Sequence, residues 1–121
     1  MEEFRFKEWK VYKDSQFVFS EVLHLVQKLP KEYRYTLGDQ LIRSSFSIVL
    51  NIAEGSGKAS EGELGRYLNI SMGSSYESIA ALDTLAQNNF LEKPAHKALE
   101  GKLIEMCRQL GGLKKRMGVK K

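Results

Sequence analysis

The sequence contains few of the residues that cross-link small folds or interrupt helices. Cysteine occurs once, at Cys107, and proline twice, at Pro30 and Pro94. A single cysteine excludes an intramolecular disulfide, so a hydrophobic core has to stabilise the fold. A chain of 121 residues is long enough to bury such a core in one domain. The scarcity of proline and the long stretches without turn residues favour an all-α chain.

Long apolar segments are also absent. The N-terminal sequence MEEFRFKEWK is charged and lacks the apolar stretch of a signal peptide. No apolar run approaches the roughly 20 residues of a membrane-spanning helix. Hydrophobic residues make up 42% of the chain and charged residues 28%, as in ordinary soluble proteins. We therefore expect a cytoplasmic protein with no membrane partner.

The sequence has no recognisable catalytic or metal-binding motif. It contains no P-loop, zinc-ligand spacing, nucleophile elbow or Ser/His/Asp set. A ferritin-like site needs a Glu-x-x-His motif on each of two helices, and the chain offers the single pair Glu21 and His24. Cys107 lies in an apolar stripe, and no spacing links it to His24 or His96, which predicts a buried structural thiol. We expect no catalytic, cofactor-binding or metal-binding residues, and hence no enzyme.

Four segments have the periodicity of amphipathic helices. The first runs from about residue 8 to residue 28 and ends before Pro30, since a proline pushes the preceding residue out of the helical region. The second begins near Thr36 as its N-cap and ends near residue 54, with Gly55 or Gly57 expected in a left-handed C-terminal cap.

The third helix begins at Ser60, because Ser60 and Glu63 match a capping box, and it ends near Asn88 and Asn89. Pro94 fits the first turn of the fourth helix. That helix has a strict heptad-like apolar pattern at Leu99, Leu103, Met106, Leu110, Leu113 and Met117.

Four helices with short connectors predict an all-α fold, an up-down-up-down antiparallel four-helix bundle. It occupies residues 1–121 as one domain, with a short N-terminal arm at 1–7 and a basic C-terminal tail at 114–121.

The second and third helices carry unusually small and polar residues at positions that should be buried. Gly73 predicts a close approach of two backbones, because glycine inside a helix costs about 1 kcal/mol relative to alanine. If the pair is antiparallel about Gly57, Arg43 lies near Met72 and Gly73, within one turn of Glu77. The same register lets Glu54 and Arg66 meet near the loop. We interpret the set as a structural polar network of ion pairs rather than a catalytic site: Arg43, Asn51, Glu54, Arg66 and Glu77.

Positive charge is concentrated at the C-terminal end. Residues 94–121 carry eight Lys or Arg against two acids, whereas residues 60–93 carry two against five. The excess of positive charge in residues 94–121 predicts contact with nucleic acid or an acidic partner. The alternative is a solvated helix end whose cations complement the helix dipole. The candidate phosphate-binding residues are Lys97, Lys102, Arg108, Lys114, Lys115, Arg116, Lys120 and Lys121.

The motif QLIRSSFSIVLNIAEG, followed by S-x-x-E-x-x-R-Y-L and G-S-x-x-E, resembles the four-helix bundle family encoded in 23S rRNA intervening sequences. The resemblance covers nearly the whole chain. It implies a bacterial cytoplasmic protein of poorly defined role that assembles into a homo-oligomer, with a pentamer expected. It also implies kinship with the accessory protein of diversity-generating retroelements, which binds nucleic acid through a basic surface. Ser44, Ser45 and Leu50 depart from the family pattern, which puts a detailed transfer of interface contacts in doubt.

Two functions therefore remain open from the sequence. One is a non-enzymatic oligomer that binds RNA or DNA through the basic surface without reading bases. The other is a protein–protein interaction scaffold with no nucleic-acid role, docking a partner through an aromatic rim made of Phe4, Phe6, Trp9, Tyr33 and Tyr35. Nucleic-acid binding should weaken steeply with salt, and aromatic docking should not.

Overall fold

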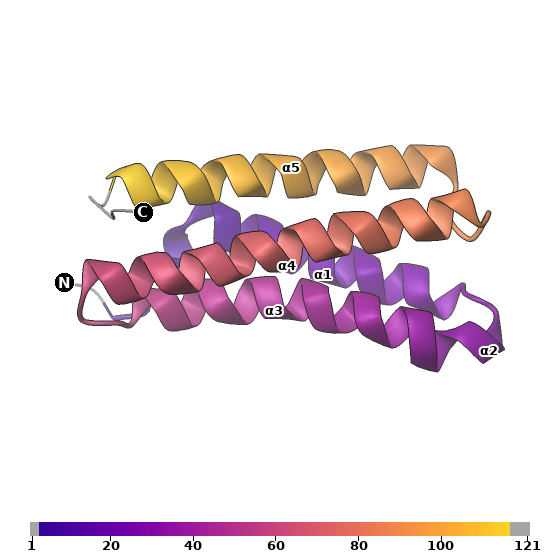
Figure 1. Cartoon of the computed structure of the whole chain (residues 1–121), viewed down its shortest axis with the longest axis horizontal. Coiled ribbons are helices and arrows are strands. Elements are labelled where there is room, and N and C mark those ends of the chain that lie inside the picture. The colour runs from indigo at the N-terminus through magenta and orange to yellow at the C-terminus, as the bar shows by residue number, and fades with distance from the viewer. Residues whose placement is uncertain (1–2, 117–121) are drawn as a thin grey trace.

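The computed structural model describes residues 3–116 and shows four long helices packed side by side (Figure 1). The helices are α1 (Lys10–Gln27), α3 (Asp39–Ser56), α4 (Glu61–Gln87) and α5 (Lys93–Arg116). α3 packs against α1 and α4, and α5 packs against α4 and α1, so neighbours in the chain are neighbours in space. The predicted all-α antiparallel bundle is confirmed. Over residues 3–116, no helix combines the length and apolar character that a membrane crossing requires.

The core lies along the bundle axis and is built from the helical stripes. The heptad-like residues of α5 from Leu99 to Leu113 are all buried, as predicted, while Met117 lies outside the described residues. Leu41, Ile48 and Ile52 of α3 are fully buried. Each such side chain contributes roughly 1.5–3 kcal/mol relative to an exposed one. The largest fully buried side chains are Leu29, Leu41, Ile48, Ile52, Leu68, Leu82, Leu103, Met106 and Leu110.

The start of the second long helix differs from the prediction. Pro30, with φ −53° and ψ 142°, is the N-cap of a helical run that begins at α2 (Lys31–Tyr33) and continues through the π-helical segment η2 (Arg34–Gly38) into α3. Thr36 is therefore inside the run, where its hydroxyl donates to the Tyr33 carbonyl. The physical reason is that an N-cap residue has a non-helical ψ and needs no helical N–H donor, so the proline that stops α1 from continuing also fits the position before the next helical run.

The third helix begins as predicted. Ser60 is the N-cap of α4, and its hydroxyl oxygen accepts a hydrogen bond of 3.1 Å from the Glu63 amide. The helix ends at Gln87, and Asn89 adopts the left-handed region with φ 67°. The left-handed cap predicted for α3 is wrong. Gly57 has φ −91°, and Gly55 lies inside the helix, because α3 continues to Ser56 before the chain turns.

Candidate nucleic-acid interface

The α3–α4 hairpin is joined by hydroxyl groups that lie between the two helices. The Ser44 and Ser78 hydroxyl oxygens are 2.7 Å apart, and those of Ser47 and Ser74 are 2.8 Å apart. The buried Ser71 hydroxyl donates to the Ile48 carbonyl oxygen at 3.1 Å. A buried hydroxyl without a partner is costly, so these pairs hold the hairpin in one register.

That register is different from the one predicted. Arg43 lies level with Ser78, because its neighbour Ser44 contacts Ser78, and not level with Met72 and Gly73. The displacement is about one and a half helical turns. The contacting pairs are centred near Ser60, so the two helices pair about Ser60 and not about Gly57.

Close backbone approach occurs in the hairpin, but not at the predicted glycine. A Cβ atom on Gly55 would lie 2.8 Å from the Tyr67 Cβ, whereas one on Gly73 would meet nothing within 4 Å. Gly55 is buried and Gly73 is exposed. Gly55 therefore lets the two helices converge beside their loop, and the prediction for Gly73 is wrong.

The predicted polar network does not form as ion pairs across the hairpin. Arg43, Glu54, Arg66 and Glu77 are all exposed rather than buried. Within residues 3–116, no ion pair joins Arg43 to Glu77 or Glu54 to Arg66.

The charges nearest the loop pair with residues three or four positions away in the sequence instead. Glu54 lies 3.7 Å from Lys58, and Arg66 lies 3.6 Å from Glu63. The exception is Asn51, which is half-buried and donates to the Ser47 carbonyl and hydroxyl oxygens. The inter-helix polar contacts come from serines, because a short hydroxyl fits where two helices lie close and a long charged side chain extends into solvent.

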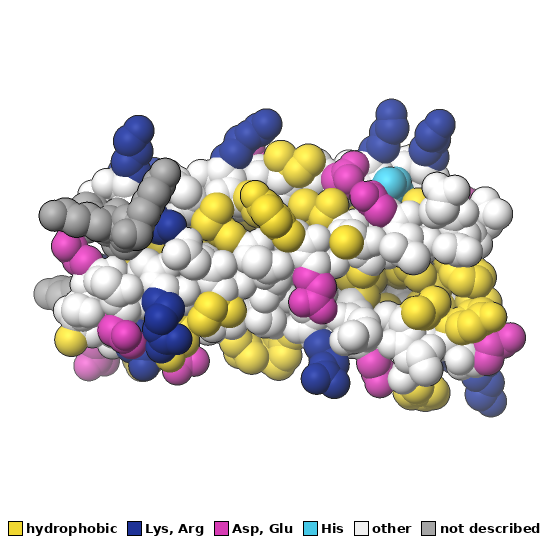
Figure 2. Space-filling view, in the orientation of Figure 1, with side chains coloured by type: hydrophobic (Ala, Val, Ile, Leu, Met, Phe, Trp, Pro, Cys, Tyr) yellow, Lys and Arg dark blue, Asp and Glu magenta, His cyan; other side chains and the backbone are white. Residues whose placement is uncertain are grey.

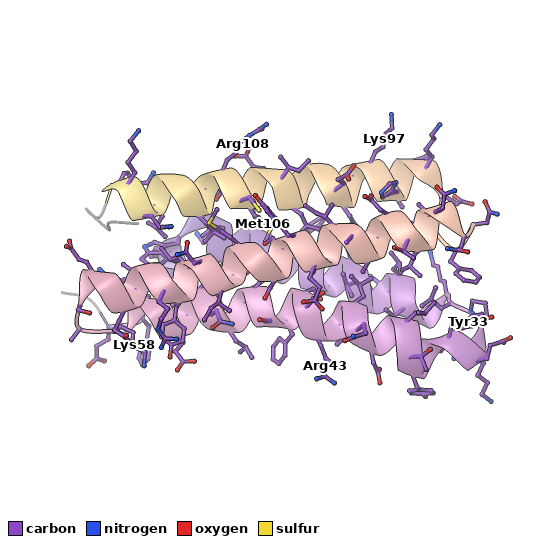
Figure 3. All side chains as sticks on the ribbon, in the orientation of Figure 1. Tyr33, Arg43, Lys58, Lys97, Met106 and Arg108 are labelled. Carbon is purple, nitrogen blue, oxygen red and sulfur yellow. The ribbon has the colours of Figure 1, made fainter. Side chains whose placement is uncertain are left out.

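The basic residues of α5 form a row on its outer side. Lys97, Arg108 and Lys115 are exposed, and their spacing along the sequence places them on one helical face, opposite the buried heptad-like residues. Figure 3 shows Lys97 and Arg108 pointing away from the bundle on the same side, and Figure 2 shows Lys and Arg side chains along that edge. The row spans about 27 Å at 1.5 Å per residue. Lys93, which was not among the predicted residues, is exposed at the start of the same helix.

Two of the lysines predicted to contact phosphate instead contact neighbouring helices of the bundle. Lys102 is half-buried, with its ammonium 3.7 Å from the Asp14 carboxylate and over the Phe17 ring. Lys114 donates to the Asn69 side-chain oxygen. Both lie on the flanks of α5, where the neighbouring helices provide partners. Lys120 and Lys121 lie outside the described residues.

Asp14 connects α1 to α5. Its carboxylate accepts hydrogen bonds of 2.8 Å from Lys10 and from Gln109. Burial opposes ionisation of this carboxyl group, but the hydrogen bonds from Lys10 and Gln109 and the positive charges of Lys10 and Lys102 outweigh it and lower the pKa of Asp14. The ionised carboxylate therefore holds Lys102 against the bundle, so Lys102 takes no part in the outer row.

A second cluster of cations was not visible in the sequence. Arg116, Arg5 and Lys58 line a cavity of about 600 Å³ at the end of the bundle, beside Ser60 at the start of α4. Arg5 comes from the 3-10 turn η1 (Arg5–Glu8) and Lys58 from the α3–α4 loop. Residues so far apart in the chain meet only because the helices alternate in direction, so no local sequence pattern marks them.

The aromatic rim proposed for protein docking is divided between the two ends of the bundle. Tyr33 lies at the end opposite the N-terminus, about the length of α1 away from the N-terminal aromatic residues (Figures 1 and 3). Tyr33 packs on Phe90, with ring centroids 5.3 Å apart. Phe6 packs on Tyr12 at 4.8 Å, and Phe6 and Trp9 are half-buried against the core. The rim is not a continuous surface, because α1 separates its two halves.

The single thiol is not set up as a nucleophile. Cys107 is half-buried, and burial raises the pKa of its thiol, although a hydrogen bond with Ser75 opposes the shift. The raised pKa keeps Cys107 protonated at neutral pH.

Geometry of this kind defines a class: an antiparallel four-helix bundle with a serine-linked central hairpin and a cationic outer helix. The family model of the 23S rRNA-intervening sequence protein matches residues 7–112. The chain therefore belongs to this family, as the resemblance in the sequence predicted.

A solved structure supports the fold assignment. The chain is similar to a protein of unknown function from the S23 ribosomal protein family of Bacteroides thetaiotaomicron VPI-5482. The TM-score is 0.81 at 21% sequence identity, and the match covers 87% of this chain and 98% of the other. At this identity the likeness establishes the fold alone. No curated protein matches the sequence.

Proposed function

We propose that the chain is a non-enzymatic, self-associating bundle protein that binds nucleic acid through the outer face of α5. The observation that carries the proposal is the row of Lys97, Arg108 and Lys115 on one exposed helical face. Such a row matches a phosphate backbone, whose neutralisation supplies most of non-specific binding. α5 contains only two acids, Glu100 and Glu105, whereas α4 is net acidic and repels phosphate.

The binding should have little sequence preference. The row sits on one helix of a bundle, with no helix-turn-helix and no sheet with exposed aromatics among residues 3–116. Lysine and arginine side chains on an open face contact phosphates without reaching base edges in a defined geometry. RNA and DNA are therefore both expected ligands, and affinity depends on charge and salt.

The experiment measures fluorescence anisotropy of unrelated RNA and DNA oligomers at several salt concentrations. The variant replaces Lys97, Arg108 and Lys115 by Gln. The matched control replaces the exposed Lys13, Lys28 and Lys31, which belong to other segments than α5, and so removes the same charge. We expect a loss of at least about tenfold in affinity for the α5 variant, a much smaller loss for the control, and a shallower salt dependence for the α5 variant. Equal losses, or no binding by the parent at low salt, would reject the nucleic-acid role and leave the scaffold role.

The self-association has separate support, because the exposed apolar side chains gather on two different faces. One is a groove of about 360 Å³ between α4 and α5, lined by Met72, Tyr76, Ile79, Ile104, Cys107 and Arg108. The other lies on α3, where Phe46 is 44% exposed and Leu50 is 47% exposed, with Phe46 packed on Phe19 of α1. Figure 2 shows hydrophobic side chains both over the α4–α5 groove and along the edge formed by α3.

Two unlike apolar faces on one chain fit a head-to-tail interface, which generates a ring when the rotation between subunits closes. A second copy of this chain is the occupant that each face suits, since the groove is concave and the α3 face presents a projecting phenylalanine. The resemblance to the family gives five as the expected number of subunits. A ring also places several α5 rows on one particle, which raises the avidity for a long nucleic acid.

Mixing two variants tests this arrangement. Phe46→Glu disables the α3 face and Ile104→Glu disables the groove, so each variant alone should be smaller than the parent by light scattering. Mixed in equal amounts, they should form a heterodimer through the one intact pair of faces. A parent of monomer mass at micromolar concentration would reject self-association, and a mixture that stays monomeric would reject the head-to-tail geometry.

A further inference from the structure

A cluster of metal-ligating side chains lies where α4 faces α5, one helical turn from the apolar groove between the same two helices. Asp83 of α4 and His96 and Glu100 of α5 each offer one ligand atom, and these atoms all lie within 4.8 Å of one another. His96 Nε2 is 2.7 Å from Asp83 Oδ1. Figure 2 shows a histidine beside acidic side chains on this face.

The helix geometry positions the three side chains. His96 and Glu100 are four residues apart, so they lie one above the other on the same side of α5. The α4–α5 connection is short, with Asn89 in a left-handed conformation, and it brings the last turns of α4 against the first turns of α5. Asp83 therefore approaches the His96–Glu100 pair from the opposite helix.

The two carboxylates of the cluster lie close to each other beside one histidine. Two carboxylates come within 4.8 Å of each other, and Glu100 is half-buried. In the part of the chain from residue 3 to residue 116, neither Asp83 nor Glu100 has a Lys or Arg within 4 Å. A cation bound between two neighbouring carboxylates offsets the repulsion between them.

We propose that Asp83, His96 and Glu100 bind a divalent first-row transition-metal ion, with Zn²⁺ the probe of choice. One imidazole nitrogen and two carboxylate oxygens suit zinc-like ions, whereas Mg²⁺ and Ca²⁺ prefer oxygen ligands only. Ligand atoms about 2.0–2.2 Å from a tetrahedral ion lie about 3.4 Å from each other, so small side-chain rotations close the present spacing. The ion would replace the His96–Asp83 hydrogen bond.

Three protein ligands leave the remaining coordination position of the ion for water or an exogenous ligand, as in zinc sites that are not purely structural. The cluster joins α4 to α5 near the loop between them. Metal binding should therefore also stabilise this end of the bundle.

The experiment uses untagged, full-length protein, because a histidine tag would bind the same ions. Isothermal titration with Zn²⁺ should give one site per chain, with an affinity at least about tenfold higher than for Mg²⁺ or Ca²⁺. His96→Gln, Asp83→Asn and Glu100→Gln should each reduce the Zn²⁺ affinity by about tenfold or more.

Two controls make the assignment specific. His24→Gln removes the other histidine of the chain and Cys107→Ser removes the single thiol, and both should bind Zn²⁺ like the parent. The melting temperature should rise with Zn²⁺ in the parent and in the controls, and not in the three ligand variants, while all proteins melt within a few degrees of each other in EDTA.

Three outcomes would overturn the proposal. The first is a parent whose Zn²⁺ affinity is weaker than millimolar. The second is binding that survives the loss of His96 and Asp83. The third is a stoichiometry of one ion per two chains, which would place the ligands on different subunits.

Discussion

The α3–α4 hairpin and helix α5 belong to the same antiparallel bundle, yet different contacts hold them in place. The hairpin is joined by short side chains, with hydroxyl pairs such as Ser44–Ser78 and the backbone approach at Gly55. α5 is held by large apolar residues, among them Leu103 and Met106, which are fully buried.

The two regions differ in what their contacts do: some contacts set the axial register of a helix, and others only hold a helix against the bundle. Hydroxyl pairs have to face their partners, so they set the axial position of α3 against α4. Most of the attachment of α5 comes from apolar side chains, which have no such directional demands, although Gln109 also donates a hydrogen bond to Asp14 of α1. The outer face of α5 is left for cations. The hairpin therefore fixes the geometry of the bundle, and the outer residues of α5 can change without disturbing that geometry. Four sets of substitutions test this division, in decreasing order of expected effect.

The largest effect should follow from placing a charge in either region of the core. Ile48→Asp in the hairpin and Leu103→Asp in α5 each bury an unpaired carboxylate, which costs several kcal/mol against a total stability of roughly 5–15 kcal/mol. Both variants should be largely unfolded by circular dichroism. Ala98→Asp, at an exposed position of α5, is the control and should remain folded. A variant at 48 or 103 that melts like the parent would contradict the assigned core.

The next effect distinguishes two glycines of the same hairpin. Gly55→Ala forces the helices apart, because the new Cβ would lie 2.8 Å from Tyr67 Cβ, and it should destabilise by about 1–3 kcal/mol. Gly73→Ala adds a methyl group in open space and should stabilise the helix by up to about 1 kcal/mol. Urea unfolding of both variants measures the difference. Equal effects would show that the hairpin tolerates separation at its loop.

The third effect concerns the hydroxyl pair. Ser44→Ala leaves the buried Ser78 hydroxyl without its inter-helix partner and should cost about 1–3 kcal/mol. The double variant Ser44→Ala/Ser78→Ala removes both groups, so it should be less destabilised than the sum of the single variants. A double-mutant cycle from denaturant unfolding gives the coupling, and strict additivity would show that the pair does not set the register.

The smallest effect is expected at the exposed charges of the hairpin. Arg43→Ala and Glu77→Ala should change the free energy of unfolding by no more than about 0.5 kcal/mol, because both side chains are exposed and do not pair with each other. Thermal melts of dilute protein measure this. A loss of more than 1 kcal/mol in either variant would restore the ion-pair interpretation that the sequence favoured.

The fold was predictable from the sequence because its signals are local. The apolar pattern of α5 and the Ser60–Glu63 capping box each lie within a few residues, and both are present in the structure. Pro30 was interpreted correctly as the end of α1, but its second role as the start of the next helical run was missed, since Thr36 offered a more familiar cap.

The polar contacts were not predictable to the same extent. The predicted register of α3 against α4 was wrong by about one and a half turns. In the observed register Arg43 and Glu77 still lie at nearly the same level, but both side chains are exposed and do not pair. The serines were noted as unusual, but their pairing across the hairpin follows only from the three-dimensional approach of the helices. Likewise, Asp83 and His96 lie on different helices, so their proximity has no signature in the sequence.

The hydrogen bond between Asp14 and Gln109 has a consequence for the order of folding. It joins residues 95 positions apart, whereas the serine contacts of the hairpin join residues 23 to 34 apart. Closing the shorter loop costs less chain entropy, so the hairpin should form early and the α1–α5 contact last. The contact made by Asp14 then forms after the folding transition state, when most of the bundle is already in place. Removing the Asp14 side chain should raise the unfolding rate and leave the folding rate almost unchanged in stopped-flow experiments. A slower folding rate would show instead that the Asp14–Gln109 contact is already formed in the folding nucleus.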